Sequence, residues 1–148
     1  MTADLHAASD PPAPSAAVLR GQCLCGAVRY AVKNAFRYSF NCHCSNCRRA
    51  TGSAFKPLAG IERDALRLTQ GEAELRLYGD PMAAHDAICG RCGSRLYSVV
   101  REGKWVHVTL GTLVDTPGIR PTAHIFVGSK AAWFEITDTL PQYDEFPP

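Results

Sequence analysis

Hydrophobic and polar residues alternate along much of this chain, with the period of two that is typical of β-strands. Residues 27–32 alternate after a glycine, and residues 37–42 alternate again just before a group of cysteines. The same pattern predicts strands at residues 66–68, 74–78, 95–101, 105–110 and 124–127. Turns containing glycine or proline separate these segments, and helical periodicity favours one short helix, at residues 45–50. We therefore expect a mainly β fold built from packed antiparallel sheets.

The chain has 148 residues, of which 46% are hydrophobic and 20% charged, as is ordinary for one globular domain. We expect a flexible N-terminal arm at residues 1–17, which include a proline-rich stretch, and a single domain at residues 18–148. The sequence shows no secretory signal and no apolar run near the roughly 20 residues that span a bilayer, so we expect a cytoplasmic location. A net charge of +2, without a basic patch interleaved with aromatics, argues against nucleic acid or a membrane as the main partner.

All seven cysteines fall into clusters, at residues 23–25, 42–47 and 89–92. The first pair, Cys23 and Cys25, shares one face of an extended segment, and the last pair, Cys89 and Cys92, flanks a tight glycine-containing knuckle. Clustered thiols in a reducing compartment favour a metal over disulfides, and two such pairs can complete a tetrahedral zinc site. Four free thiols and an iron–sulfur cluster are the alternatives. A structural zinc here would link the first strand to the middle of the chain.

The middle cluster offers three sulfur ligands, Cys42, Cys44 and Cys47. Cys42 and Cys44 share a strand face, and the turn that follows can bring Cys47 to the same ion. Three protein ligands leave a fourth position open, as in catalytic zinc, and a soft thiolate set favours a soft ligand such as a substrate thiol. On zinc that thiol would be held as a nucleophilic thiolate. Completion by His43, which would make the second site structural, is the alternative, although the alternation turns His43 to the opposite face.

Several segments carry a resemblance to a known family, at residues 21–30, 42–49, 51–55, 89–94 and 124–133. In these segments the chain resembles the glutathione-dependent formaldehyde-activating enzyme family, which also includes the centromere protein V domain. The likeness runs from about Leu19 to Tyr143 and includes all seven cysteines. It implies an Mss4-like β-tent with a structural zinc on one set of four sulfurs, Cys23, Cys25, Cys89 and Cys92. It also implies a second zinc on Cys42, Cys44 and Cys47, tied to binding a thiol cosubstrate.

The resemblance and the open site together predict an enzyme. The expected activity is that of a zinc-dependent carbon–sulfur lyase of the S-(hydroxymethyl)glutathione synthase type, which joins a glutathione-like thiol to a small aldehyde such as formaldehyde. Such an enzyme would hold two zinc ions per chain. The alternative from a different class is a zinc-stabilised binding module without catalytic activity. Exposed edge strands would also permit a homodimer.

A few other side chains are candidates for roles near the open site. Arg48 and Arg49 follow the cysteine triplet directly and could grip the carboxylates of the thiol cosubstrate, or else lie solvated on a short helix. The histidines His85, His107 and His124 are candidate proton-transfer groups, although a hydrogen-bonded histidine within the sheet is the simpler interpretation of His107. Lys56 could pair with an anionic substrate, but as a lone lysine before a proline it is expected at the surface. Residues 140–148 are expected to form an extended tail anchored by Tyr143 or Phe146.

Overall fold

The computed structural model describes residues 16–148, and this part of the chain is mainly β, as predicted. Residues 1–15, most of the predicted N-terminal arm, lie outside the described residues. The strands are β1 (Val18–Gln22), β2 (Arg29–Lys33), β3 (Tyr38–Cys42), β4 (Lys56–Glu62), β5 (Leu66–Gln70), β6 (Leu75–Gly79), β7 (His85–Cys89), β8 (Arg95–Val100), β9 (Trp105–Thr109) and β10 (His124–Ile125). The helices are α1 (Ser45–Thr51) and four 3-10 turns, η1 (Arg63–Ala65), η2 (Glu72–Glu74), η3 (Leu110–Thr112) and η4 (Val127–Ser129). Within residues 16–148, no helix combines the length and apolar character needed to cross a membrane.

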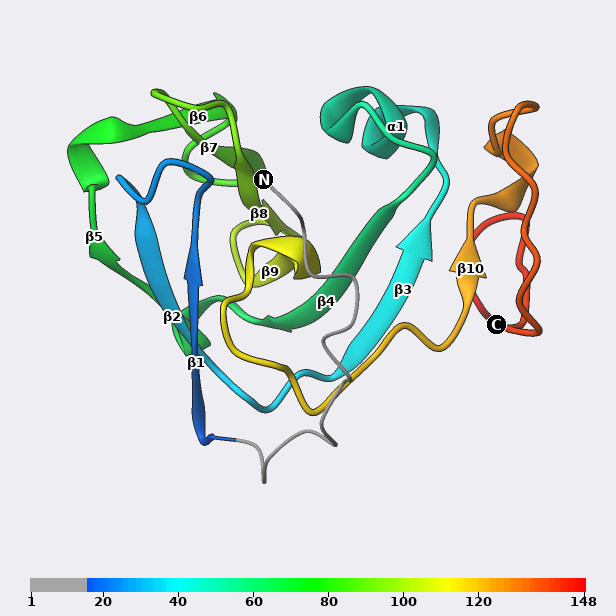
Figure 1. The fold of residues 1–148 in the computed structure, drawn as a ribbon, viewed down its shortest axis with the longest axis horizontal. Coiled ribbons are helices and arrows are strands. Elements are labelled where there is room, and N and C mark those ends of the chain that lie inside the picture. The colour runs from blue at the N-terminus through cyan, green and yellow to red at the C-terminus, as the bar shows by residue number, and fades with distance from the viewer. Residues whose placement is uncertain (1–15) are drawn as a thin grey trace, which may run out of the picture.

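The strands form two sheets. The smaller has the order β1-β2-β5, and the larger has the order β10-β3-β4-β9-β8-β7-β6. Neighbouring strands are antiparallel except for β10, which pairs with β3 in parallel. Figure 1 shows β1 and β2 on one side of the molecule and β3, β4 and β10 on the other, with α1 following the end of β3. The larger sheet therefore supplies most of the scaffold on which a site can be built.

The hydrophobic core lies between the two sheets. Leu19 and Tyr30 from the smaller sheet pack in one buried cluster with Tyr97, Val106 and Val108 from the larger sheet. Each of these side chains is at most 2% exposed, and the rings of Tyr30 and Tyr97 meet edge to face at a centroid distance of 6.1 Å. Burial of this apolar area is the main force that holds the sheets together.

The opposite face of the larger sheet carries sulfur and polar side chains. Residues directly opposite one another in an antiparallel pair project to the same face. Cys42 lies opposite Lys56, and His107, Ser98 and Asp86 are successive partners across β9, β8 and β7. Lys56 donates a hydrogen bond to Ser98, so these strands share one face. Any reaction at Cys42 is therefore separated from the main core by the sheet itself.

The alternation of residues did not predict β1, β4 or β7. In β4 the reason is physical, because proline and glycine are usually unfavourable inside a strand. Pro57 is only the second residue of β4, and Gly60 makes room for a ring, since a Cβ there would lie 2.1 Å from the Tyr38 side chain. β10 is shorter than the predicted strand at residues 124–127, because Phe126 adopts a left-handed conformation with φ 55°.

Candidate metal centres and active site

Four cysteine sulfurs converge where β1 approaches the turn between β7 and β8. The Sγ atoms of Cys23, Cys25, Cys89 and Cys92 all lie within 4.8 Å of one another. The separation is 3.6 Å between Cys23 and Cys25 and 3.8 Å between Cys25 and Cys89. The turn after Cys92 passes through Gly93 in a left-handed conformation with φ 79°, which glycine adopts without strain.

The four-sulfur group fits a tetrahedral zinc ion. Zinc–sulfur bonds of about 2.3 Å in tetrahedral geometry place the sulfurs roughly 3.8 Å apart, close to the separations seen here. Zinc ligands are thiolates, and hydrogen bonding from Ser94 lowers the pKa of Cys92 to about 5. The backbone N–H of Val28 also donates to Cys23 Sγ over 3.3 Å. The group could therefore hold a metal ion through Cys23, Cys25, Cys89 and Cys92.

Three further sulfurs converge at the end of β3 and the start of α1. The Sγ atoms of Cys42, Cys44 and Cys47 lie within 4.8 Å of one another, with Cys42 buried and the other two partly exposed. Cys44 is the N-cap of α1, and its Sγ accepts a hydrogen bond from the backbone N–H of Cys47 over 3.2 Å. The helix turn thus brings the third sulfur back to the first two.

The charge state of this triplet also suits a metal ion. Hydrogen bonds from the Cys42 and Cys47 thiols lower the pKa of Cys44 to about 2, while the same hydrogen bond to Cys44 raises the pKa of Cys42. Three sulfurs this close cannot all be thiolates unless a cation balances their charge. A soft divalent ion such as zinc matches the donor set, and three ligands leave one tetrahedral position for another group.

His43, which lies between two of these cysteines in sequence, faces a different set of partners. Its Nε2 lies 2.7 Å from Nδ1 of His124, and Nε2 of His124 lies 2.9 Å from the carboxylate of Asp138. Because a carboxylate only accepts, His124 donates to Asp138 through Nε2–H, and in its neutral form His124 accepts at Nδ1 from Nε2–H of His43. Burial, with a further contribution from His124, lowers the pKa of His43 to about 4 and so keeps it neutral. Nδ1 of His43 is buried without a hydrogen-bond partner in the structure.

Lys56 is the main correction to the site expected from sequence. Its side chain is 3% exposed, so the prediction of a surface lysine is wrong. The register of β4 places it opposite Cys42, and its Nζ donates to Ser98 Oγ over 2.9 Å. Ser98 in turn donates to Asp86 Oδ1, whose other oxygen pairs with Arg95 over 2.9 Å. Burial lowers the pKa of Lys56, and the network through Ser98 satisfies one of its donors.

A polar cavity of about 470 Å³ lies between α1 and the β6–β8 part of the larger sheet. Arg49 and Arg95 contribute positive charge to its wall, and Asp86 contributes negative charge. Of the two arginines predicted to bind the cosubstrate, Arg49 lines this cavity. Arg48 does not line it, and its Nε is buried without a hydrogen-bond partner among residues 16–148.

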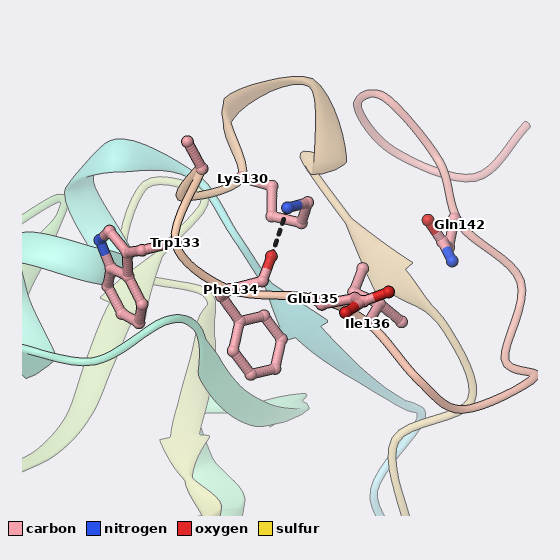
Figure 2. A pocket seen from close by; sticks show the side chains of 7 residues that line it. Lys130, Trp133, Phe134, Glu135, Ile136 and Gln142 are labelled. Carbon is pink, nitrogen blue, oxygen red and sulfur yellow. Dashed lines mark hydrogen bonds between the residues drawn. The ribbon is translucent and has the colours of Figure 1, made fainter.

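A second cavity, of about 540 Å³, belongs to the loop after β10 and includes none of the cysteines (Figure 2). Its lining is formed by seven residues of this loop and the tail, Lys130, Ala132, Trp133, Phe134, Glu135, Ile136 and Gln142. Figure 2 shows Lys130 reaching the carbonyl oxygen of Phe134 while the Phe134 ring points away from Lys130. That ring packs on His43 and on Phe55, at centroid distances of 6.1 and 5.6 Å. Through Phe134, this loop therefore packs against the ring of His43.

The other predicted side chains are placed as follows. His107 Nε2 lies 2.7 Å from the Tyr38 hydroxyl, which agrees with the expected hydrogen-bonded histidine of a sheet. His85 contacts the carbonyl oxygen of Asp80 through Nδ1 and is remote in register from the triplet. Tyr143 anchors the tail, because its backbone N–H donates to His124 O over 2.9 Å and its ring packs near Ile125.

The fold and these groups define a mainly β protein with two cysteine clusters that could hold metal ions, one with four sulfurs and one with three. A family model described as glutathione-dependent formaldehyde-activating enzyme matches residues 18–129. The chain belongs to this family, and the resemblance noted in its motifs is confirmed.

Individual relatives agree with this assignment. The chain is 31% identical over 131 residues to a Halomonas elongata protein named "Putative glutathione-dependent formaldehyde-activating enzyme", and the match covers 80% of this chain and 81% of the relative. A crystal structure of a Rhodobacter sphaeroides protein superposes with a TM-score of 0.55 at 30% sequence identity. That match covers 70% of this chain and 92% of the other, so the fold is shared with a solved structure.

Sequence reasoning missed the burial of Lys56, and it missed four other side chains of this site altogether, Ser98, Asp86, Arg95 and Asp138. Lys56 heads a segment whose apolar residues continue to Ile61, which could have indicated a buried strand. Ser98, Asp86 and Asp138 have no such signal, because long-range pairing alone brings them into the networks of Lys56 and His124.

Proposed function

We propose that this protein is a carbon–sulfur lyase that reversibly joins a glutathione-like thiol to a small aldehyde, formaldehyde being the aldehyde in the family's name. The observation that carries the proposal is that three sulfurs converge on the face of the sheet that also carries Lys56. Among the described residues, no fourth protein ligand joins them. Zinc on these sulfurs would supply a position where a substrate thiol is held as a thiolate. The four-sulfur group would hold a second, structural zinc.

The side chains around the triplet would organise the reactants. Lys56 is buried near Cys47 and Cys42, and in its protonated form it would stabilise negative charge that develops on sulfur or on the aldehyde oxygen. Ser98 and Asp86 fix the position of its Nζ through the hydrogen-bonded network. The hydrogen-bonded chain of Asp138, His124 and His43, in which both histidines are buried, holds the backbone between Cys42 and Cys44 in place.

The polar cavity between α1 and the sheet is suited to the thiol cosubstrate. Asn46 and Arg49 belong to α1, the helix that carries Cys47, so the cavity lies next to the triplet. Arg49 and Arg95 would pair with carboxylates, as guanidinium groups do in bidentate fashion. Arg48 is not part of the proposed cosubstrate site.

The reaction balances without an oxidant. The thiolate sulfur forms a bond to the carbonyl carbon, the carbonyl π electrons move to oxygen, and that oxygen takes one proton to give an S-hydroxyalkyl adduct. The reverse direction breaks the same carbon–sulfur bond and returns the proton. The protein would accelerate both directions by orienting the reactants and stabilising charge.

The decisive variant is Cys44→Ser. Serine is a favoured N-cap residue, so the substitution removes a sulfur while preserving the start of α1. We expect the folded variant to lose thiol binding and adduct formation, measured by NMR exchange between formaldehyde, glutathione and their adduct. In cobalt-substituted wild type, glutathione should change the visible spectrum. Unchanged glutathione affinity in Cys44→Ser would contradict the proposal and favour a binding module.

A further inference from the structure

A third cavity, mostly apolar, lies on the same face of the larger sheet as the cysteine triplet. Its volume is about 460 Å³, within the range of small-molecule sites. Most of its wall is aromatic or aliphatic, with contributions from β3, β4, β8 and β10 and from the tail. These apolar residues are Tyr38, Phe40, Leu58, Val100, Ile125, Phe146 and Pro147.

This cavity begins one residue pair from the triplet. Phe40 lies opposite Leu58 in the register of β3 and β4, and the next pair on the same face is Cys42 and Lys56. Side chains two residues apart on a strand are roughly 7 Å apart. Ile125 is the parallel partner of Cys42, and it forms a buried cluster with Cys42 and Leu58. The cavity therefore adjoins the triplet on one face of the sheet, with Leu58 and Ile125 at the boundary between them.

The charge of this cavity is positive and comes from one side chain. Arg101 stands at its edge, with its guanidinium 5.6 Å from the Tyr38 ring centroid and 5.1 Å from that of Trp105. These rings orient the guanidinium, because cations are attracted to aromatic faces. Burial, together with Lys56 and Arg101, lowers the pKa of His107 to about 4, so His107 is neutral near pH 7.

The backbone at Arg101 reinforces this placement. Arg101 and Glu102 have φ values of 52° and 56°, a left-handed conformation that is uncommon for residues other than glycine. Consecutive left-handed residues fit the tight turn of a β-hairpin. The β8–β9 turn thus holds Arg101 at the mouth of an apolar cavity in which no described lining residue is acidic.

We propose that the apolar cavity binds a planar apolar group of the substrate that reacts at the triplet, with an anionic substituent of that group facing Arg101. The inference rests on the proposed function. It extends the range of aldehyde substrates from formaldehyde to aromatic aldehydes that bear a carboxylate. Formaldehyde, with two non-hydrogen atoms, would leave the cavity unfilled. The polar cavity on the other side of Lys56 would take the thiol, so the two reactants would approach the triplet from opposite sides.

The test uses the zinc-loaded full chain and 4-methylbenzoate, an unreactive analogue of 4-formylbenzoate. Saturable NMR shifts should appear at Val100, Arg101 and Ile125. Val100→Trp, which fills the cavity, should weaken binding by about tenfold or more, whereas Met82→Trp, at an exposed position outside the cavity, should not. The neutral analogue 4-methylbenzamide should bind about three- to tenfold more weakly, and this difference should disappear in Arg101→Gln.

Absence of saturable shifts at the cavity, or wild-type affinity in Val100→Trp, would overturn the proposal. Arg101→Gln provides an independent test if Val100→Trp fails to fold. Adduct formation by glutathione with formaldehyde and with 4-formylbenzoate separates this inference from the proposed function. If the protein catalyses adduct formation with formaldehyde but does not bind 4-methylbenzoate, the proposed role of the cavity is refuted and the proposed carbon–sulfur lyase activity is not. If 4-methylbenzoate binds but neither aldehyde reacts, the proposed lyase activity is refuted. If 4-methylbenzoate binds but only formaldehyde reacts, the assignment of aromatic aldehydes as substrates is refuted.

Discussion

Replacing Cys89 by serine should destabilise the fold more than replacing any one sulfur of the triplet. Cys89 is buried at the end of β7, and its sulfur lies 3.8 Å from that of Cys25, which is 64 residues earlier in the chain. A metal on these sulfurs closes a long loop, and loop closure restricts the unfolded chain most when the loop is long. Cys89→Ser leaves three sulfurs and should weaken metal binding at this site.

The size of the effect follows from the loop. By the chain-entropy relation for cross-links, closing a loop of this length contributes about 4 kcal/mol at 25 °C. That is a large fraction of the 5–15 kcal/mol by which a typical domain is stable, and it corresponds to a fall in Tm of about 8–16 °C. The triplet spans only residues 42–47, for which the same relation gives about 2 kcal/mol.

The assay compares wild type, Cys89→Ser and the matched control Cys44→Ser by urea unfolding, with zinc content measured on the same samples. We expect wild type to hold two zinc ions and each variant to release zinc from its altered site at a lower chelator concentration than wild type, with the larger loss of unfolding free energy in Cys89→Ser. The reasoning would be refuted if the altered site of Cys89→Ser held zinc as tightly as in wild type, or if its loss of unfolding free energy did not exceed that of Cys44→Ser.

Three further predictions concern the scaffold. Gly71→Ala should lower the unfolding free energy by about 2–4 kcal/mol, because φ is 82° and a Cβ there would lie 2.0 Å from a backbone oxygen. The control is Gly111→Ala, where a Cβ would meet no atom within 4 Å, and it should be nearly neutral in the same urea titration. Hydrogen bonding from Arg20 lowers the pKa of Asp115 to about 2, so the stabilisation that this ion pair gives the fold should be present above about pH 4 and lost as pH falls toward 2. The unfolding free energies of Asp115→Asn and wild type should therefore converge at pH 2, and a difference that stays constant with pH would contradict this. The pKa of His107 is lowered to about 4 by burial, so stability should decline as pH falls from 6.5 to 4, and His107→Gln should have a flatter dependence in that range than wild type.

The spacing of the cysteines predicted the site more completely than the alternation of hydrophobic and polar residues predicted the fold. Cysteines two or three residues apart lie close together in any fold, and the four ligands that a tetrahedral ion needs indicated that the first and last pairs meet; the structure does bring both sulfur groups together. The mainly β class is confirmed, but the inner strand β4 was missed because Pro57 and Gly60 resemble turn residues. A local pattern does not report the Tyr38 ring that fills the space above Gly60.

Side chains whose positions depend on pairing between distant strands could not be predicted. Lys56 is buried because β4 pairs with β3 in a register that puts it opposite Cys42, and Ser98 reaches it from a strand 42 residues away. Asp138 likewise meets His124 only after the chain has folded back along β10. The N-terminal arm, the cytoplasmic location and the homodimer stay predictions.

The strand β3 alternates between two environments, with Phe40 and Cys42 on the face of the cavities and Ser39 and Asn41 on the other. Substitutions at Tyr38 and Phe40, which share this face with Cys42, would therefore alter which molecules are accepted without touching the main core on the other side of the sheet. Homologous chains could diverge in substrate range while keeping one scaffold, and libraries for directed evolution could be restricted to every second residue of the sheet.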